Sequence, residues 1–424
     1  MEVKASMVRR MLVVLTGMAV VGLAASGAAG AQQTVRVGLT YGKPALKSVV
    51  ISGSGEWRAR RFSEPFNGEV RIAAARGELV LQIGARRGGV GPWIELRPNE
   101  QGRSLTADGS AYRGSLRVEV HANAQLKVVN IVGVEDYVRG VVTNEMFEHP
   151  GAFKVQAVIS RTLAVYIRDI EKKHARDGFD ICATGHCQVY RGVNSERRLA
   201  DEAVAATRGE VLTYRGRPIF SAYHANAGGR TQPVDEAWPG SIRRKFPYLS
   251  AVASPYDGQA NDLPGYAWCY RWRREMRPEE IRKLIGGSER RLGEVRDVVV
   301  KRTTSTGRVR ELEIVGTRGR TSVTGASKVR GALGVPSALF EVERDGGCFV
   351  LHGRGRGHGV GLSQHGALGM AKAGHRYEEI LAHFYRGVEL TENYGSGKSR
   401  KLLPPELHFE ALESSPVTVP PGVS

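Results

Sequence analysis

The chain has 424 residues and a formal net charge of +18 at pH 7. Such an excess of positive charge favours polyanionic surroundings, namely nucleic acid, anionic lipid headgroups or the acidic polymers of a cell wall, although a chain that is arginine-rich throughout has it too. After residue 31, no stretch is long and apolar enough to cross a bilayer, which excludes a transmembrane domain in the mature protein.

The first 31 residues have the three parts of a secretory signal. Lys4, Arg9 and Arg10 form a basic start, residues 11–23 are apolar, and residues 29–31 (AGA) form a small-residue cleavage site. The apolar stretch is shorter than the roughly 20 residues of an ordinary membrane span, so we expect cleavage, with a retained anchor as the alternative. Export to the periplasm, the cell wall or the extracellular space follows, and it argues against a nucleic-acid partner.

The predicted elements begin with strands. Residues 34–132 alternate apolar and polar side chains in β-branched runs broken by glycine and asparagine, a pattern that predicts antiparallel sheet. Helices follow at 134–141 and 153–172, and Pro150 marks the start of the second. Ser195 is expected to cap a third helix, and residues 211–214 and 219–223 to form a hairpin.

Further along, the pattern predicts helices at 278–284, 327–333, 367–373 and 377–385, and strands at 296–301, 309–316 and near residue 340. The expected fold class is therefore α+β. A β-rich N-terminal region (32–132) packs with a helical core (133–395), which contains a β-rich linking region at about 270–345. The polar, Pro-rich tail (396–424) is expected to be disordered.

Two of the four cysteines lie close together, at Cys182 and Cys187, with His186 between them and His174 a short way upstream. Two thiolates and one or two imidazoles in one short segment are typical of a tetrahedral zinc site. A local disulfide or a pair of free buried thiols fits the same spacing. The other two cysteines either pair with each other or stay reduced.

Glu145 is an isolated acid in the segment GVVTNEM, just before the long helix. The dipole of that helix favours the ionised carboxylate, whereas burial beside Met146 and Phe147 raises the pKa toward the range that a general acid needs. The alternative is that Glu145 only caps the helix. Ordinary glycoside hydrolysis uses two carboxylates, and Glu148 and Asp180 are the nearest candidates for a second.

One signature and four further motifs carry a family resemblance. In chain order they are YRGSLRV from Tyr112, GVVTNEM…FKVQAVISRTLA from Gly140, FDICATGHCQVYRGV from Phe179, FSAYHANAGGRT from Phe220 and GRGHGVGLSQHGALGMAKAG from Gly355. Together they closely resemble the SpoIID/LytB family, the stage II sporulation protein D type of cell-wall protein.

The resemblance implies a lytic transglycosylase that cuts the MurNAc–GlcNAc bond of peptidoglycan glycan strands. Such an enzyme needs one acid, because the acid protonates the glycosidic oxygen and the resulting carboxylate then deprotonates the sugar's own C6 hydroxyl. The products have 1,6-anhydro-muramic acid ends, and Glu145 is the expected acid and base. The resemblance also implies a zinc ion, with Cys182, Cys187, His186 and His174 as the expected ligands.

Substrate contacts are expected from the long helix and the later motifs, at Lys154, Gln156, Arg161, Tyr190, His224, His358, Ser363 and Gln364. For Arg161 the alternative is a structural ion pair, and for His224 a zinc ligand or a satisfied buried histidine. Ser363 and His358 lack the nucleophile elbow of a serine hydrolase. The glycines around them do not match a dinucleotide fingerprint.

A second function is a non-catalytic modifier of an N-acetylmuramoyl-L-alanine amidase, since LytB-type relatives are known as amidase modifiers. A third is a zinc hydrolase, which needs an open metal position that a cysteine-rich ligand set disfavours. The chain departs from the family pattern in Met146-Phe147, where Met-Pro is usual, and in Leu163, where Tyr is usual. Both changes reshape the pocket without removing a proton-transfer group.

Overall fold

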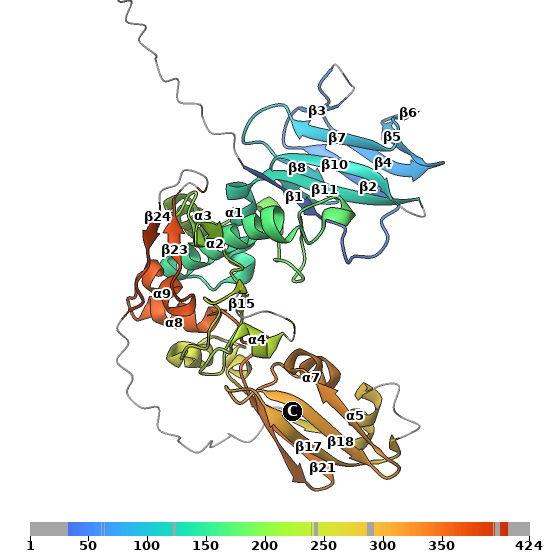
Figure 1. Cartoon of the computed structure of the whole chain (residues 1–424). Helices are drawn as coiled ribbons and strands as arrows, with labels where there is room; N and C mark the ends of the chain where they lie inside the picture. The colour runs from blue at the N-terminus through green and yellow to red at the C-terminus, as the bar shows by residue number, and fades with distance from the viewer. Residues whose placement is uncertain are drawn as a thin grey trace, which may run out of the picture. The chain divides into compact units, whose positions relative to one another are not determined.

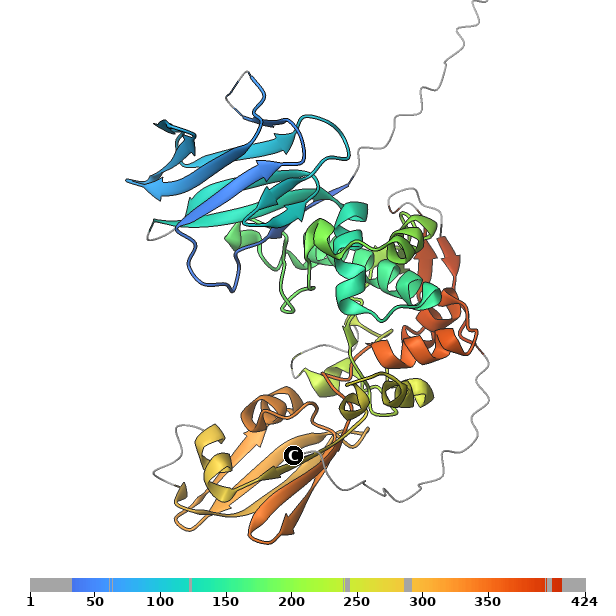
Figure 2. The same ribbon diagram turned by 180° about the vertical axis from the view of Figure 1, so that it is seen from behind.

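The computed structural model describes residues 33–405, apart from 61, 63, 122–123, 239, 241–244, 286–291, 393 and 395–398. The predicted secretory signal and most of the predicted disordered tail lie outside these residues. The described residues combine helices with several largely antiparallel sheets, which confirms the α+β class (Figures 1 and 2).

Two six-stranded sheets form the N-terminal region and share one hydrophobic core. Their strand orders are β12-β1-β11-β10-β7-β3 and β6-β5-β4-β2-β8-β9. Buried side chains alternate with less buried ones along strands such as β2 and β10, as the period of two predicts. The bounds are β1 Thr34–Gly38, β2 Ser48–Gly53, β3 Trp57–Ala59, β4 Glu69–Ala75, β5 Glu78–Ile83, β6 Arg86–Gly89, β7 Trp93–Pro98, β8 Leu105–Ala107, β9 Ser110–Tyr112, β10 Ser115–His121, β11 Gln125–Gly133 and β12 Ile181–Cys182.

The buried helix α2 is packed against four others, because its apolar side chains cover most of its circumference. Pro150 occupies its first turn, and the ring of His149 accepts a 3.2 Å hydrogen bond from the amide of Gly151. The helices are α1 Val134–Glu145, α2 Pro150–Tyr166, the π-helix η2 Ile167–Glu171, α3 Arg198–Ala206, α8 Gln364–Lys372 and α9 Tyr377–Phe384.

Two predictions for these helices are wrong in detail. The helix α1 continues past residue 141 to Glu145. The helix α3 begins at Arg198 without a side-chain cap. The hydroxyl of Ser195 instead donates to the carbonyl of Gly140, 3.0 Å away, and ties the turn before α3 to α1. The short connecting elements are η3 Ala175–Asp177, η4 Gly192–Ser195, α4 Val234–Ala237, η6 Pro255–Asp262 and η7 Ala267–Cys269.

Two small sheets join segments that are far apart in sequence. Tyr223 and His224 (β15) pair in parallel with Leu362 and Ser363 (β22), which brings two of the glycine-rich motifs side by side. The other sheet has the order β14-β13-β23-β24. Its strands are β13 Val211–Tyr214, β14 Arg217–Pro218, β23 Glu389–Thr391 and β24 Ser399–Lys401.

This second sheet corrects two predictions. The predicted hairpin forms, but its returning strand is only β14, and the chain then leaves the sheet instead of continuing as a strand to residue 223. The tail expected to be disordered from residue 396 contains β24, which pairs with β23 through main-chain hydrogen bonds.

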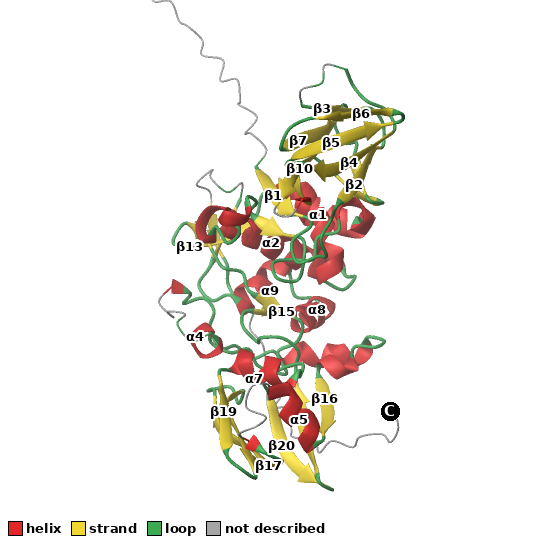
Figure 3. Ribbon diagram, turned by 90° about the vertical axis from the view of Figure 1, so that its right-hand side faces the viewer, coloured by secondary structure: helices red, strands yellow, loops and turns green. Residues whose placement is uncertain are grey.

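The predicted linking region has a hydrophobic core of its own, separate from that of the N-terminal sheets. Helices α5 and α7 pack on its three-stranded sheets, as Figure 3 also shows. The elements are β16 Arg271–Met276, α5 Pro278–Ile285, β17 Val295–Thr303, β18 Val309–Gly316, β19 Arg320–Thr324, α7 Ala326–Leu333, β20 Phe340–Asp345 and β21 Cys348–Arg354. The bounds of α5, α7, β17, β18 and β20 agree closely with the predicted ones, whereas β16, β19 and β21 were not predicted.

Candidate functional site

Glu145 is the last residue of α1, and its carboxylate is held by hydrogen bonds from several segments. Its Oε1 accepts a 2.6 Å bond from the amide of Val189, and the hydroxyl of Tyr223 is a second partner. The side chain of Gln364 donates to the main-chain carbonyl of Glu145. Burial raises the pKa of the Glu145 carboxyl, and these hydrogen bonds offset the rise in part.

The position of Glu145 in the helix corrects the electrostatic argument from the sequence. Glu145 lies at the C-terminal end of α1, and α2 begins only at Pro150. Because the C-terminal end of a helix carries partial negative charge, the dipole of α1 disfavours the ionised carboxylate instead of favouring it. Both burial and the helix dipole therefore favour the protonated form that a general acid needs.

A cavity of about 770 Å³ contains Glu145 in its wall. Three of the predicted substrate contacts line it, namely His224, His358 and Gln364. A volume of this size suits one or two sugar rings of a bound polymer.

The two histidines are held neutral by their surroundings. Burial lowers the pKa of His224 well below its usual value and that of His358 to about 4. Nδ1 of His224 lies 3.1 Å from the carbonyl of Val360, so this nitrogen donates and carries the proton. Nε2 of His224 is then a buried acceptor with no hydrogen-bond partner among the described residues.

Three predicted contacts from α2 do not reach the cavity. Arg161 is buried and forms a two-bond ion pair with Glu135, at 2.7 and 2.9 Å, so the alternative of a structural ion pair holds. Gln156 is fully buried and donates to the hydroxyl of Ser160, 2.9 Å away. The ammonium of Lys154 lies 5.8 Å from the centre of the Tyr377 ring. Gln156 and Arg161 are therefore interior residues instead of substrate contacts, whereas the contact predicted for Lys154, which is half-buried outside the cavity, stays a prediction.

Two other predicted contacts also belong to the protein interior. The buried hydroxyl of Tyr190 donates a 2.7 Å hydrogen bond to Asn130. Ser363 is buried, caps α8 and donates a 2.5 Å hydrogen bond to Asp257. Neither side chain lines the cavity.

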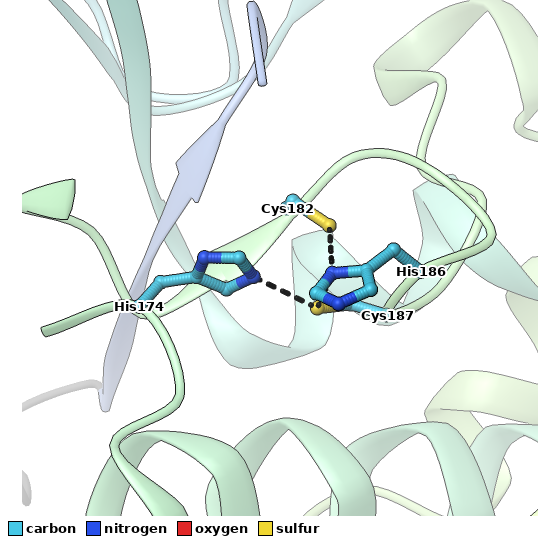
Figure 4. A group of neighbouring side chains, drawn as sticks. All are labelled: His174, Cys182, His186 and Cys187. Carbon is cyan, nitrogen blue, oxygen red and sulfur yellow. Dashed lines mark hydrogen bonds between the residues drawn. The ribbon is translucent and has the colours of Figure 1, made fainter. Parts of the chain in front are cut away.

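The four predicted metal ligands converge on one point (Figure 4). One ligand atom of each lies within 4.8 Å of the others. Sγ of Cys187 is 3.4 Å from Nε2 of His174, and Sγ of Cys182 is 3.6 Å from Nδ1 of His186. Separations of this kind approach the roughly 3.3–3.8 Å between neighbouring ligand atoms of a tetrahedral zinc ion.

The second contact of His174 also fits a metal site. Its Nδ1 lies 2.7 Å from a carboxylate oxygen of Asp177, which leaves Nε2 free to face the sulfur atoms. A carboxylate behind a histidine is the usual way in which proteins orient a metal-binding imidazole. All four cysteines are free thiols, so neither of the two disulfides that the sequence left open as alternatives is present.

The cluster and Glu145 share one segment of chain. His186 and Cys187 line the cavity together with Glu145, and Val189, which binds the Glu145 carboxylate, follows two residues later. At the other end of the segment, Cys182 pairs with Gly38 of β1.

Comparison with known proteins identifies the family. Residues 122–214 match the family model described as stage II sporulation protein. The chain is 30% identical to stage II sporulation protein D of Bacillus subtilis over 295 residues, which are 65% of this chain and 79% of that protein. The chain belongs to the SpoIID/LytB family.

Two further relatives of this family member carry different names. It is 29% identical to an uncharacterised protein of Brachyspira hyodysenteriae, over 85% of this chain and 94% of that protein. It is 27% identical to the amidase enhancer of Bacillus subtilis, over 60% of this chain but only 40% of that protein. Residues 248–361 match a domain of unknown function, DUF8618. None of the described helices of this family member has the length and apolarity of a membrane span.

The cavity also contains residues that the sequence analysis of this SpoIID/LytB protein missed. They are Glu171, Tyr223, Trp238, Arg330 and Arg356, among others. Tyr223 directly precedes His224 in a quoted motif, so its place at the site could have been predicted from the sequence. Arg330 and Arg356 both lie in the segment that matches the domain of unknown function. Arg356 also lies in the quoted motif that begins at Gly355, whereas the pattern around Arg330 indicated only a helix.

Proposed function

We propose that this protein is an exported peptidoglycan lytic transglycosylase that cleaves the MurNAc–GlcNAc bond. The observation that carries the proposal is the placement of Glu145, a carboxyl group whose pKa is raised by burial in the wall of a cavity of about 770 Å³. General acids of glycan-cleaving enzymes depend on such a shift, because the proton must stay bound near neutral pH.

In the proposed reaction, Glu145 first protonates the glycosidic oxygen while the bond from that oxygen to C1 of the muramic acid breaks. The Glu145 carboxylate then takes the proton of the C6 hydroxyl, whose oxygen bonds to C1 and closes the 1,6-anhydro ring. Glu145 is therefore protonated again at the end of the reaction, and no water is consumed. The unpartnered Nε2 of His224 supports this reading, since it is a ready acceptor for a sugar hydroxyl.

The surrounding carboxylates bear on the choice between this reaction and hydrolysis. Asp180 forms a 2.7 Å ion pair with Arg36 and does not line the cavity, and Glu148 is exposed outside it. Glu171 does line the cavity, from the end of η2, but it is exposed to solvent. An inverting hydrolase with Glu145 as acid and Glu171 as base is therefore the chemical competitor.

The His/Cys cluster supports a structural zinc ion in this proposal. His174, Cys182, His186 and Cys187 would hold it, and the two thiolates and two imidazoles fill a tetrahedral site. A closed site of this kind contributes folding free energy and leaves no position for a reacting water. Its expected role is to fix the segment that leads to Val189.

The other candidate is a non-catalytic wall-binding modifier of an N-acetylmuramoyl-L-alanine amidase. The similarity to a protein named amidase enhancer favours it. Mass spectrometry of purified glycan strands after incubation with the protein separates the two candidates. New 1,6-anhydro ends support the transglycosylase, whereas intact strands together with faster cleavage by an added amidase support the modifier.

A further inference from the structure

Part of the cavity wall comes from the segment that matches a domain of unknown function. This segment contributes Arg330, on α7, and Arg356, in the loop that follows β21. Both residues line the cavity that contains Glu145, although they belong to a different part of the chain. The segment therefore presents two guanidinium groups to the proposed reaction site.

Neither guanidinium has a carboxylate partner among the residues that the structure describes. The recorded side-chain contacts of Arg356 are the ring of Trp268, whose centre is 4.5 Å away, and a weak 3.9 Å contact with Sγ of Cys269. Burial lowers the pKa of Arg330, and the positive charge of Arg356 lowers it further. Two like charges that face one cavity without neutralisation make it favourable for an anion to bind there.

The acidic residues of the same cavity do not supply that anion. The Glu145 carboxylate is engaged with Val189 and Tyr223. Glu171 lines the cavity but forms no recorded ion pair with either arginine within the described part of the chain. The compensating negative charge is therefore expected from a ligand.

An exposed aromatic ring adjoins one of the two arginines, Arg356. The side chain of Trp268 is 43% exposed although the guanidinium of Arg356 lies over its ring. Tyr266, 40% exposed, packs edge-on against Phe147, two residues beyond Glu145, with ring centres 4.9 Å apart. Exposed rings beside a polar cleft offer flat apolar surface to the C–H face of a sugar.

We propose that Arg330 and Arg356 form a carboxylate-binding subsite of the cavity, which holds an anionic sugar of the glycan beside the ring of Trp268. This inference rests on the proposed function, because that function makes the glycan the substrate. Two sources supply the carboxylate: the lactyl group of a muramic acid that carries no peptide, or the acidic groups of a peptide stem. Guanidinium groups suit either, because they bind carboxylates through paired, charge-assisted hydrogen bonds.

The test is a calorimetric titration of the full chain carrying Glu145→Gln, which removes the proposed acid and so prevents cleavage. The probes are three oligosaccharides of equal length: muramic-acid strands without peptide, the same strands with peptide stems, and chitin oligomers, which have no carboxylate. Arg330→Gln and Arg356→Gln are compared with Lys328→Gln, an exposed lysine on the same helix that does not line the cavity. Thermal melts establish that each variant is folded.

We expect Arg330→Gln and Arg356→Gln each to weaken binding of a muramic-acid probe about 10-fold or more, from the loss of charge-assisted hydrogen bonds. Lys328→Gln is expected to bind as the parent does, and chitin binding to change little in any variant. A loss confined to stem-free strands assigns the lactyl carboxylate, and a loss confined to stem-bearing strands assigns the stem. Equal losses for chitin and muramic-acid probes, or no loss, overturn the subsite. These titrations measure binding without turnover. A failure of the subsite can therefore be told apart from a failure of the proposed function, which the absence of anhydro ends would show.

Discussion

The amide of Val189 donates a 2.6 Å hydrogen bond to Oε1 of Glu145. Val189 follows Cys187 by two residues, and the same segment begins at β12, which pairs with β1 of the N-terminal sheet. The His/Cys cluster, the N-terminal sheet and the proposed acid are thus connected through one short stretch of main chain. The orientation of the Glu145 carboxylate depends on how that stretch is folded.

Glu145→Gln is expected to abolish strand cleavage while glycan binding persists. The amide keeps the size of the side chain and its acceptor toward Val189, but it has no acidic proton. Loss of a well-placed general acid or base commonly reduces the rate about 10²- to 10⁴-fold. The measurement is the rate of new strand ends, with Glu148→Gln, an exposed acid outside the cavity, as the control. Near-parental cleavage by Glu145→Gln refutes the assignment.

The raised pKa of Glu145 also predicts how stability changes with pH. An acid whose pKa is higher in the folded state binds its proton more tightly there, so its contribution to stability falls as pH rises from the unfolded value of about 4.3 through the folded one. Glu145→Gln removes this effect. The melting temperature of the variant minus that of the parent is therefore expected to be larger at pH 7.5 than at pH 4. For Glu148→Gln this difference is expected to stay the same at both pH values. A difference that shrinks with rising pH contradicts the account.

Zinc binding is tested by metal analysis and thermal melting. We expect about one zinc per chain, and a lower melting temperature after chelation, because metal binding free energy is also folding free energy. Cys182→Ser is expected to lose the metal. Asp177→Asn, which alters the partner of His174, is expected to weaken zinc binding about 10- to 100-fold. Cys269→Ser, a free buried thiol outside the cluster, is the control. Metal-free protein from zinc-replete cells argues against the site.

Arg161 provides a prediction that separates structure from substrate contact. Its guanidinium is buried against Glu135, so Glu135→Gln leaves a buried charge without its partner. Breaking such a pair typically costs about 3 kcal/mol in the free energy of unfolding. Denaturant unfolding is expected to show this loss, while KM for glycan strands stays unchanged in folded protein. If Glu135→Gln instead raised KM and kept the parental stability, Arg161 would be assigned to substrate binding.

Local patterns predicted the elements well, because strands such as β2 and β10 have a regular alternation of buried and less buried side chains. The metal cluster was also predictable, since three of its four residues lie within six positions. The same patterns failed where an element end depends on a distant partner, as at Ser195, whose hydroxyl binds Gly140.

The site was harder to predict than the fold. Arg161 has the residue type of a substrate contact, and only the position of Glu135 on α1 decides its role. Arg330 comes from an ordinary helix pattern, and the packing of distant elements alone brings it to the cavity. Arg356 lies two residues before His358 in a quoted motif, but no feature of that motif indicated its role. A sequence motif records which residues are near one another in the chain, whereas a cavity depends on which segments meet.

The most direct test of the central claim is the source of the oxygen in the new strand ends. Purified glycan strands are cleaved in water labelled with oxygen-18, by the parent and by Glu171→Gln, and the ends are analysed by mass spectrometry. A single acid that uses the sugar's own C6 hydroxyl predicts 1,6-anhydro ends without label from both proteins. Labelled reducing ends from the parent, lost in Glu171→Gln, would contradict it and establish a two-carboxylate hydrolase.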